Sequence, residues 1–535
     1  MRLLQAGSLA VLLAAVLGAA EGDLRLIEAV TGRDAASVRE LLAEGVAVAA
    51  AEADGSAALH SAVRNDDIEI AELLIGAGAD VKAATRYNVT PLSLACTTGN
   101  AAMIERLLQA GADANGTSEE GQSALMTAAL TGKVDAVKLL LAHGANVNTR
   151  EPIRNQTALM WAASEGNTAA AELLIEHGAE VKAESESGFT PLLFAVRNGH
   201  KEAAQALLAH GADANDVAQD GTSALNVAVV NAYYEVAALL LDHGADPNAP
   251  DARGSALHIL SWLRKPGSDG GTGLGRRSYG PPLPTGNVSS LELAKALLDH
   301  GANPNARLEI EDRLPLNRDG SVRNPPLLQI GRHTLSYNGA TPFYLAAKNG
   351  DAEYMRLLAE NGADPNITSV LGVTPLMVAS GLDYWEGESP GPFTGVSEAE
   401  RLEAVKLAVE LGNDINATAD FGEFGDFEMV GDPEYTLLYP PRNVEELSRI
   451  LPSDPRWAGC TALHGAVVSN QPSIVQYLVD QGAKVDAKNK AGWTPLMTAG
   501  GVFFANAKRD FHAAAEILRK AMIERGLLAA DGSPR

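Results

Sequence analysis

Apolar and polar positions along this chain follow one local pattern that returns many times. Within residues 190–222, apolar residues first recur at helical spacing behind Thr190 and Pro191. Threonine can accept a bond from a first-turn amide, and proline at the first helical position has no N–H to leave unpaired. A second apolar helical face follows over 201–210, and a polar, turn-rich segment over 213–221 closes the unit. The pattern predicts two short helices followed by a turn.

The same helix start returns at a nearly constant interval. Most successive starts are 32 to 34 residues apart, and two intervals are longer, 86 and 87 residues. The starts in this register are Leu24, Ala57, Thr90, Ser123, Thr157, Thr190, Ser223, Ser255, Thr341, Thr374, Thr461 and Thr494. A fixed period of this length is typical of a repeat protein, in which each unit buries its apolar face against its neighbours.

The repeated motif resembles the ankyrin repeat. Thr-Pro-Leu opens the first helix, an alanine pair follows, and Leu-Leu-x-x-Gly-Ala ends the second helix. Good matches are TPLSLAC at residue 90, TPLLFAV at 190, TPFYLAA at 341 and TPLMVAS at 374. The resemblance implies an all-α repeat solenoid of stacked helix-turn-helix repeats with β-turn fingers, in which two repeats carry long insertions.

The register of the repeats divides the chain into segments. A terminal repeat covers the end of the stack, so departures from the motif are expected there. The predicted segments are a signal peptide (1–20), a degenerate N-terminal capping repeat (21–56), regular repeats (57–263), the completion of a repeat with two insertions (264–340), further repeats (341–380), a second completion with two insertions (381–460), C-terminal repeats with a cap (461–526) and a disordered tail (527–535).

The two long intervals place insertions at matching points of repeats eight and ten. One insertion lies between the two helices of the repeat, at about 264–288 and 381–396. The other lies in the finger, at about 307–338 and 417–456. Equivalent loops of stacked repeats emerge on one edge, so we expect the paired insertions to lie side by side as one accessory surface.

The finger insertion of repeat ten has an unusual composition. Phe421, Phe424 and Phe427 alternate with acidic residues, and a short helix is predicted at 443–450. Aromatic residues are depleted in disordered segments, so we expect 417–456 to dock. It could dock on neighbouring fingers or on an external partner, and the alternative is that the insertions are flexible loops, which solenoids tolerate.

The first twenty residues do not share the repeat pattern. Arg2 precedes an apolar run, 3–17, and Gly18 and Ala20 place small residues before a cleavage point. This arrangement predicts a secretory signal peptide and an exported protein, periplasmic or extracellular. The alternatives are an uncleaved anchor and a misassigned start codon. We expect no transmembrane segment after signal removal, because no later stretch is apolar enough.

Charge and motifs narrow the chemistry. The formal net charge is −25, from 67 acidic and 42 basic residues. Such a field repels nucleic-acid phosphates, so nucleic acid is not an expected partner and a basic protein surface is weakly favoured. The glycine-rich run 270–275 lacks the Lys-Ser/Thr of a phosphate loop, and HExxH and CxxC are absent from the sequence. We therefore expect no catalytic site, no metal and no cofactor.

Five histidines occupy one repeat position, directly before Gly-Ala: His143, His177, His210, His243 and His300. A shared metal would need ring nitrogens about 3 Å apart. Neighbouring repeats separate these rings by roughly 10 Å. We expect the histidines instead to bond the last carbonyls of their helices.

The resemblance also implies where a partner would bind, because ankyrin proteins usually use finger tips and variable first-helix positions. Those positions hold Tyr87 on a tip, Trp161 and Phe194 on first helices, and Phe189 and Trp493 just before helix starts. Trp161, Phe189 and Phe194 fall in adjacent repeats and are expected to form an exposed aromatic patch, as at many interfaces. The alternative is that these rings pack against neighbouring repeats.

The sequence therefore predicts an exported ankyrin scaffold that binds a protein partner and has no enzymatic activity. Two alternatives stay open. The insertions could build the site of an enzyme or an enzyme accessory protein, or the chain could be a purely structural envelope protein.

Overall fold

A computed structural model describes residues 23–251, 253–265, 283–309, 337–382, 396–420, 457–501 and 511–533. Contacts divide the chain into two units, 1–227 and 228–535, and the division falls inside helix α14. Each unit is described by itself below.

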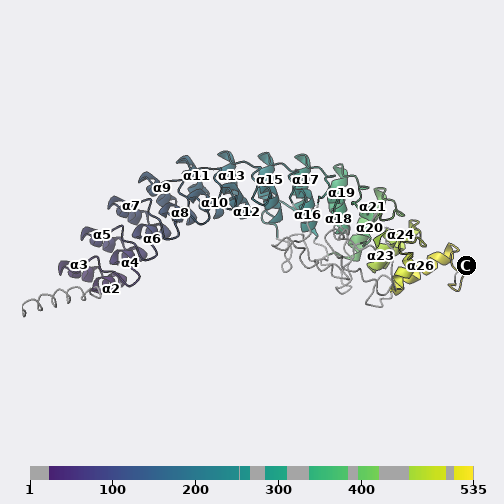
Figure 1. The fold of residues 1–535 in the computed structure, drawn as a ribbon, viewed down its shortest axis with the longest axis horizontal. Coiled ribbons are helices and arrows are strands. Elements are labelled where there is room, and N and C mark those ends of the chain that lie inside the picture. The colour runs from purple at the N-terminus through teal and green to yellow at the C-terminus, as the bar shows by residue number, and fades with distance from the viewer. Residues whose placement is uncertain are drawn as a thin grey trace, which may run out of the picture. The chain divides into compact units, whose positions relative to one another are not determined.

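The first unit is built from helix pairs. Even-numbered first helices pack against one another, odd-numbered second helices do the same, and Figure 1 shows them as two rows. The helices are α2 (Arg25–Thr31), α3 (Ala35–Ala43), α4 (Ala58–Arg64), α5 (Ile68–Gly76), α6 (Pro91–Thr98), α7 (Ala101–Gln109), α8 (Ala124–Leu130), α9 (Val134–Ala142), α10 (Ala158–Ser164), α11 (Thr168–Glu176), α12 (Pro191–Arg197), α13 (Lys201–Ala209) and the beginning of α14 (Ala224–Val230).

The second unit continues the same helix pairing with longer connections. First helices again pack on first helices, as α18 does on α16 and α20. Its helices are α15 (Tyr234–Asp242), α16 (Ala256–Arg264), α17 (Ser290–Asp299), α18 (Pro342–Lys348), α19 (Ala352–Glu360), α20 (Pro375–Ala379), α21 (Glu398–Glu410), α23 (Ala462–Val468), α24 (Pro472–Asp480), α25 (Pro495–Ala499) and α26 (His512–Glu524).

Every first helix begins directly after a start residue that the sequence predicts. The Thr190 hydroxyl, for example, accepts a bond from the Leu193 amide at 3.2 Å, which satisfies one first-turn donor. Leu24 has no side-chain cap, as expected for the degenerate first repeat. The helical register and the all-α repeat fold are therefore confirmed.

A hairpin finger follows each second helix, and an asparagine in several fingers joins neighbouring repeats. The Asn305 side chain donates to the Gly362 carbonyl at 2.9 Å and accepts from the Asp364 amide at 2.7 Å. Asn115 and Asn148 each make the same pair of bonds to the backbone of the next repeat. These bonds fix the spacing of successive fingers.

Four of the five histidines before Gly-Ala bond a carbonyl of their own helix, as predicted. The ring Nδ1 of His177 lies 2.9 Å from the Leu173 carbonyl oxygen, and that of His210 lies 2.8 Å from the Ala206 oxygen. The rings of His243 and His300 do the same. Each ring adds a second bond to a helix carbonyl that already accepts the histidine's own backbone amide.

The predicted insertions begin and end at ordered positions. Both finger insertions close on two backbone bonds at their base, between Leu308 and the pair Gly339-Ala340, and between Ala419 and the pair Gly459-Cys460. These bonds match those that close the regular fingers. Each insertion therefore replaces a finger tip and leaves the finger base intact.

Ion pairs hold the bases of the inter-helix insertions. The Arg264 side chain, 9% exposed, pairs at 2.7 Å with Asp351, which is 2% exposed, and at 3.1 Å with Glu353. The neighbouring Lys265 lies 2.9 Å from Glu400 of repeat ten, directly after the second insertion. The start of one insertion and the end of the other are thus tied together.

The structure shows a third long inter-helix connection that the sequence analysis missed. In repeat twelve, α25 ends at Ala499 and α26 begins at His512, whereas α12 and α13 are joined by 198–200 alone. The intervals between helix starts could not reveal this connection, because no later repeat start follows it. The expectation of two repeats with insertions is therefore incomplete.

Several sequence predictions concern residues outside the described ranges. They are the signal peptide at 1–20, the glycine-rich run 270–275, the short helix at 443–450 and the phenylalanines of 417–456. Within the predicted tail, a turn over 529–533 is closed by bonds from the Ala529 and Gly532 amides. In the part of the chain that the structure describes, no helix is long and apolar enough to cross a membrane.

Candidate protein-binding surface

The fingers of repeats two to six carry the most exposed tips of the first unit. Each finger is a hairpin whose closing bonds leave a short tip, as Thr85 and Val89 do around Arg86 and Tyr87. We call the tips of these five fingers, all exposed, the fingertip row. It consists of residues 86–87, 119–120, 152–154, 186–187 and 219–220.

Backbone bonds join the tips of neighbouring fingers. The Glu119 amide donates to the Tyr87 carbonyl at 3.3 Å, and the Glu186 amide donates to the Arg154 carbonyl at 2.8 Å. Pro152 stands at the same place in the fourth finger and has no N–H to donate. Among the described residues, tip bonds thus join fingers two and three and fingers four and five, and none leads into the fourth or the sixth finger.

The fourth finger is one residue longer and presents the most exposed apolar side chain of the row. The Glu151 carboxylate, only 4% exposed, accepts bonds from the amides of Ile153, Arg154 and Gln156 at 2.8 to 3.1 Å. A carboxylate that accepts several backbone amides organises the loop around it. As a result Ile153 is held 61% exposed.

Tyr87 lies where the sequence placed it. It is 54% exposed on its tip, and the Arg86 guanidinium lies 4.7 Å from the centre of its ring. Such a cation–π contact orients the ring without covering it. Tyr87 is therefore available to a partner.

Trp161, Phe189 and Phe194 do not form the exposed patch that the sequence predicts. The Phe189 and Phe194 rings are 5.5 Å apart and tilted by 57°, and Arg197 lies over Phe189. Phe194 is 8% exposed because it packs against Phe189 and neighbouring helices. Phe189 and Trp161 are half-buried, and the Trp161 indole N–H has no hydrogen-bond partner among the described residues.

Trp493 is also buried, contrary to the expectation that it is exposed. It is 5% exposed, its amide donates to Asn489 at 2.8 Å, and its carbonyl lies 3.1 Å from the His464 ring. The backbone of Trp493 therefore closes its own finger in the second unit, where its carbonyl also accepts from the Asn489 amide at 3.0 Å. The binding role of Trp493 stays a prediction. A side chain that is 5% exposed offers a partner little surface.

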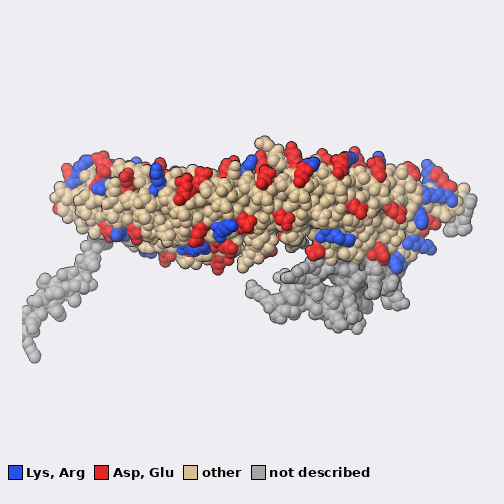
Figure 2. Space-filling model, turned by 90° about the horizontal axis from the view of Figure 1, so that it is seen from above, with Lys and Arg blue, Asp and Glu red and all other residues tan. Residues whose placement is uncertain are grey.

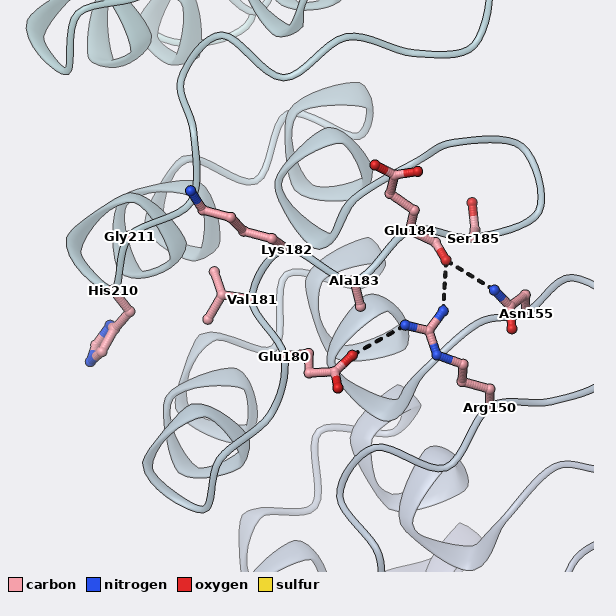
Figure 3. A pocket seen from close by; sticks show the side chains of 10 residues that line it. All are labelled: Arg150, Asn155, Glu180, Val181, Lys182, Ala183, Glu184, Ser185, His210 and Gly211. Atoms are coloured by element: carbon pink, nitrogen blue, oxygen red, sulfur yellow. Dashed lines mark hydrogen bonds and ion pairs between the residues drawn. The ribbon is translucent and has the colours of Figure 1, made fainter.

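A shallow depression of about 770 Å³ lies beside the fourth and fifth fingers (Figure 3). Within it Arg150 pairs with Glu180 at 3.2 Å, and Arg150 and Asn155 both donate to the Glu184 carbonyl. These polar groups bond one another across two repeats. The polar groups that line the depression therefore join two neighbouring fingers, and this explains them better than a ligand site does.

Among the described residues, no group of three or more His, Cys, Asp or Glu side chains is placed to hold a metal ion. One Gly-x-Ser-x-Gly string occurs in the sequence at 387–391, outside the described ranges. That pattern indicates a hydrolase only where it lies on a strand-to-helix turn. On the face shown in Figure 2, acidic and basic side chains are interspersed.

Stacked helix pairs with hairpin fingers define a helical repeat protein whose exposed edge is suited to contact with other proteins. The family can be named more closely. A model of three consecutive ankyrin repeats matches residues 92–185 and 159–251, and a model of the single ankyrin repeat matches 54–86, 338–370 and 458–490. The chain is an ankyrin repeat protein, and such repeats are typically non-catalytic binding modules.

One similar curated protein is a mitochondrial disaggregase of Bos taurus. It is 31% identical to this chain over 152 residues. The match covers 28% of this chain and 20% of the bovine protein. The similarity is thus limited to a short part of a longer protein.

Proposed function

We propose that this chain is an exported, non-enzymatic ankyrin scaffold that binds a protein partner through its fingertip row. Tyr87 and Ile153 are the apolar anchors, being 54% and 61% exposed on ordered tips. Exposed aromatic and large aliphatic residues on a rigid frame are typical of interface centres. The proposal depends on one observation: Tyr87 and Ile153 are exposed on the tips of fingers two and four.

The rigidity of the tips supports the same proposal. The buried carboxylate of Glu151 holds the tip of finger four, and backbone bonds hold the tips of fingers three and five. A surface that is ordered before binding loses less conformational freedom when the partner arrives. The row therefore offers its side chains at little entropic cost.

Export rests on the sequence of residues 1–20 alone. The short basic start, apolar run and small residues favour cleavage after Ala20 and a periplasmic or extracellular protein. N-terminal sequencing of the mature chain is expected to begin near Glu21. A mature chain that keeps Met1 would contradict export by this route.

Capture from the compartment that contains the protein tests the binding surface. Full-length wild type, Tyr87→Ala with Ile153→Ala, and the control Val134→Ala serve as baits. Val134 is 37% exposed but lies at the start of α9, on a second helix. We expect the double variant to lose partners that the control keeps, because truncated interface anchors often cost more than about 1 kcal/mol each.

The melting temperature of each bait separates binding from stability. All three substitutions are at exposed positions, so we expect melting temperatures close to that of the wild type. Equal capture by the double variant and the wild type, with all baits folded, would refute the assignment of the fingertip row.

A further inference from the structure

Asparagine side chains at one position of the repeat bind the same pair of backbone groups in the next repeat. The amide nitrogen donates to a glycine carbonyl at 2.9 to 3.0 Å, and the amide oxygen accepts from the N–H two residues later at 2.7 to 2.9 Å. These side chains belong to Asn115, Asn148, Asn248 and Asn305. The backbone pair is therefore a binding site for a carboxamide group, and it recurs along the array.

Repeat five has lysine where those repeats have asparagine. Lys182 occupies the position, so no asparagine reaches the corresponding backbone pair in repeat six. That pair is the Gly211 carbonyl and the Asp213 amide, and neither has a hydrogen-bond partner among the described residues. Gly211 and Asp213 are both exposed. The two backbone groups are thus accessible to a ligand.

Fingers five and six also lack the other bonds that join neighbouring fingers. Two residues before a helix start, Asn88 and Asn155 each donate to the next finger, but Gly188 has no side chain to do so. No tip bond like that from Glu119 to Tyr87 leads into finger six in the described part of the chain. Among these residues, no hydrogen bond therefore ties finger five to finger six.

The depression beside fingers four and five extends to this junction. Its lining includes Val181, Lys182 and Ala183 of finger five, and His210 and Gly211 after α13. Figure 3 shows Lys182 and Gly211 on the side of the depression away from Arg150, whose bonds join fingers four and five. The bonds of Arg150 thus account for one side of the depression and leave the side at Gly211 open.

Few chemical groups can bond the Gly211 carbonyl and the Asp213 amide together. A carboxylate has no N–H for the carbonyl, and an ammonium group has no acceptor for the amide. A trans peptide group has both, but its N–H and C=O point in opposite directions. The side-chain amide of asparagine or glutamine carries a donor and an acceptor side by side, as the four bound asparagines show.

We propose that the junction of fingers five and six binds an asparagine or glutamine side chain of the protein partner. The partner's amide takes the place of the asparagine that repeat five lacks. It donates to the Gly211 carbonyl and accepts from the Asp213 amide. The inference rests on the proposed function, because it adds a specific contact to the partner that the fingertip row binds.

A second lysine shows why the site belongs to repeat five. Lys82 occupies the same position in repeat two, where the next finger offers Gly111 and Asp113. Fingers two and three are joined, however, by the tip bond between Glu119 and Tyr87 and by the Asn88 side chain. A ligand amide would have to enter between fingers that are already bonded to each other. Fingers five and six have no such bonds to oppose it.

Lys182→Asn tests whether the backbone pair accepts a carboxamide. The new side chain is expected to make the two bonds that Asn148 makes in repeat four, so hydrogen exchange of the Asp213 amide, followed by NMR on the full-length chain, slows at least tenfold. The control Lys182→Met removes the charge without adding an amide and is expected to leave this exchange rate as it is in the wild type. Equal exchange in the two variants would overturn the proposal.

A small amide tests binding from solution. The probe is N-acetylasparagine methylamide, titrated into the full-length chain while the NMR resonance of the Asp213 amide is followed. N-acetylleucine methylamide has a side chain of similar shape, is equally uncharged and lacks the side-chain amide, so we expect it to bind at least tenfold more weakly. Lys182→Met is expected to bind the probe as the wild type does. Lys182→Asn is expected to lose binding, because its own amide fills the site.

Equal binding of the asparagine and leucine compounds would overturn the proposal, and so would unchanged probe binding by Lys182→Asn. Capture of the natural partner then tests the role of the site. We expect Lys182→Asn to weaken capture about tenfold, through the loss of two hydrogen bonds. The control Lys138→Asn makes the same substitution at an exposed position of α9 and is expected to keep wild-type capture.

The two proposals can fail separately. If Lys182→Asn keeps the partner while the variant with Tyr87→Ala and Ile153→Ala loses it, the proposed function stands and the carboxamide site fails. If both variants keep the partner, both proposals fail.

Discussion

Two buried histidines make the stability of the second unit sensitive to acid. His258 and His464 are each 1% exposed. The Nδ1 atom of His258 accepts a bond from the Ser255 amide at 3.2 Å, and its Nε2 atom donates to the Ala340 carbonyl at 3.2 Å. His464 makes the same two kinds of bond. Only the neutral ring can do both, because a protonated Nδ1 would face an N–H group.

Burial lowers the pKa of each ring from 6.5 to about 4, and the bonded carbonyls oppose this shift only in part. Between these two pH values the unfolded chain binds a proton that the folded chain does not. The free energy of unfolding therefore falls as the pH decreases through this window. With these pKa values, each histidine loses on the order of 2 kcal/mol of stabilisation between pH 7 and pH 5, and the two together about 4 kcal/mol.

Substitution of both histidines by methionine tests this reasoning. Methionine occupies the equivalent position in four other repeats, as Met126, Met160, Met377 and Met497, so the side chain is compatible with the fold. Urea unfolding followed by circular dichroism at pH 7 and pH 5 gives the stability lost on acidification. We expect the wild type to lose about 4 kcal/mol more than the double variant.

The control for this experiment is His243→Met, at the end of α15, where the ring is exposed to solvent. It is expected to lose as much stability on acidification as the wild type. The opposite result is a double variant whose free energy of unfolding depends on pH as that of the wild type does. It would show that the two buried rings are not the source of the acid sensitivity.

Three further outcomes follow from packing and bonding. Arg264→Met leaves the Asp351 carboxylate buried without its ion pair and is expected to cost about 3–5 kcal/mol by urea unfolding. Phe194→Ala removes a buried ring and is expected to cost about 3 kcal/mol, whereas Tyr87→Ala at an exposed tip is expected to change the melting temperature little. Asn305→Ala removes two bonds between repeats and is expected to cost about 1–2 kcal/mol; a loss too small to measure would argue against its role in spacing the fingers.

Local signals made the helix register predictable from the sequence. A threonine cap and a first-turn proline act within one turn of helix, as at Thr190 and Pro191, so neither depends on the tertiary structure. The positions of the insertions were predictable for the same reason, because intact repeat starts lie on both sides of each one. The connection 500–511 lacks a following start and was missed.

The binding surface was less predictable, because exposure depends on neighbours in space. Phe194 occupies a variable first-helix position, yet its contact with Phe189 buries it. Glu151 reads as a surface carboxylate, but it folds inward and presents Ile153 instead. The extra residue in repeat four was the only sequence signal for this finger, and it could not reveal which side chain turns inward.

Photocrosslinking from the fingertip row tests the central claim most directly. A photoreactive amino acid replaces Tyr87, Ile153 or the control Val134 in the full-length chain, and the chain is irradiated in its natural compartment. The account predicts the same protein partner crosslinked from positions 87 and 153 and not from 134. Crosslinks from 134 alone, or different proteins at 87 and 153, would contradict a single binding surface along the fingertip row.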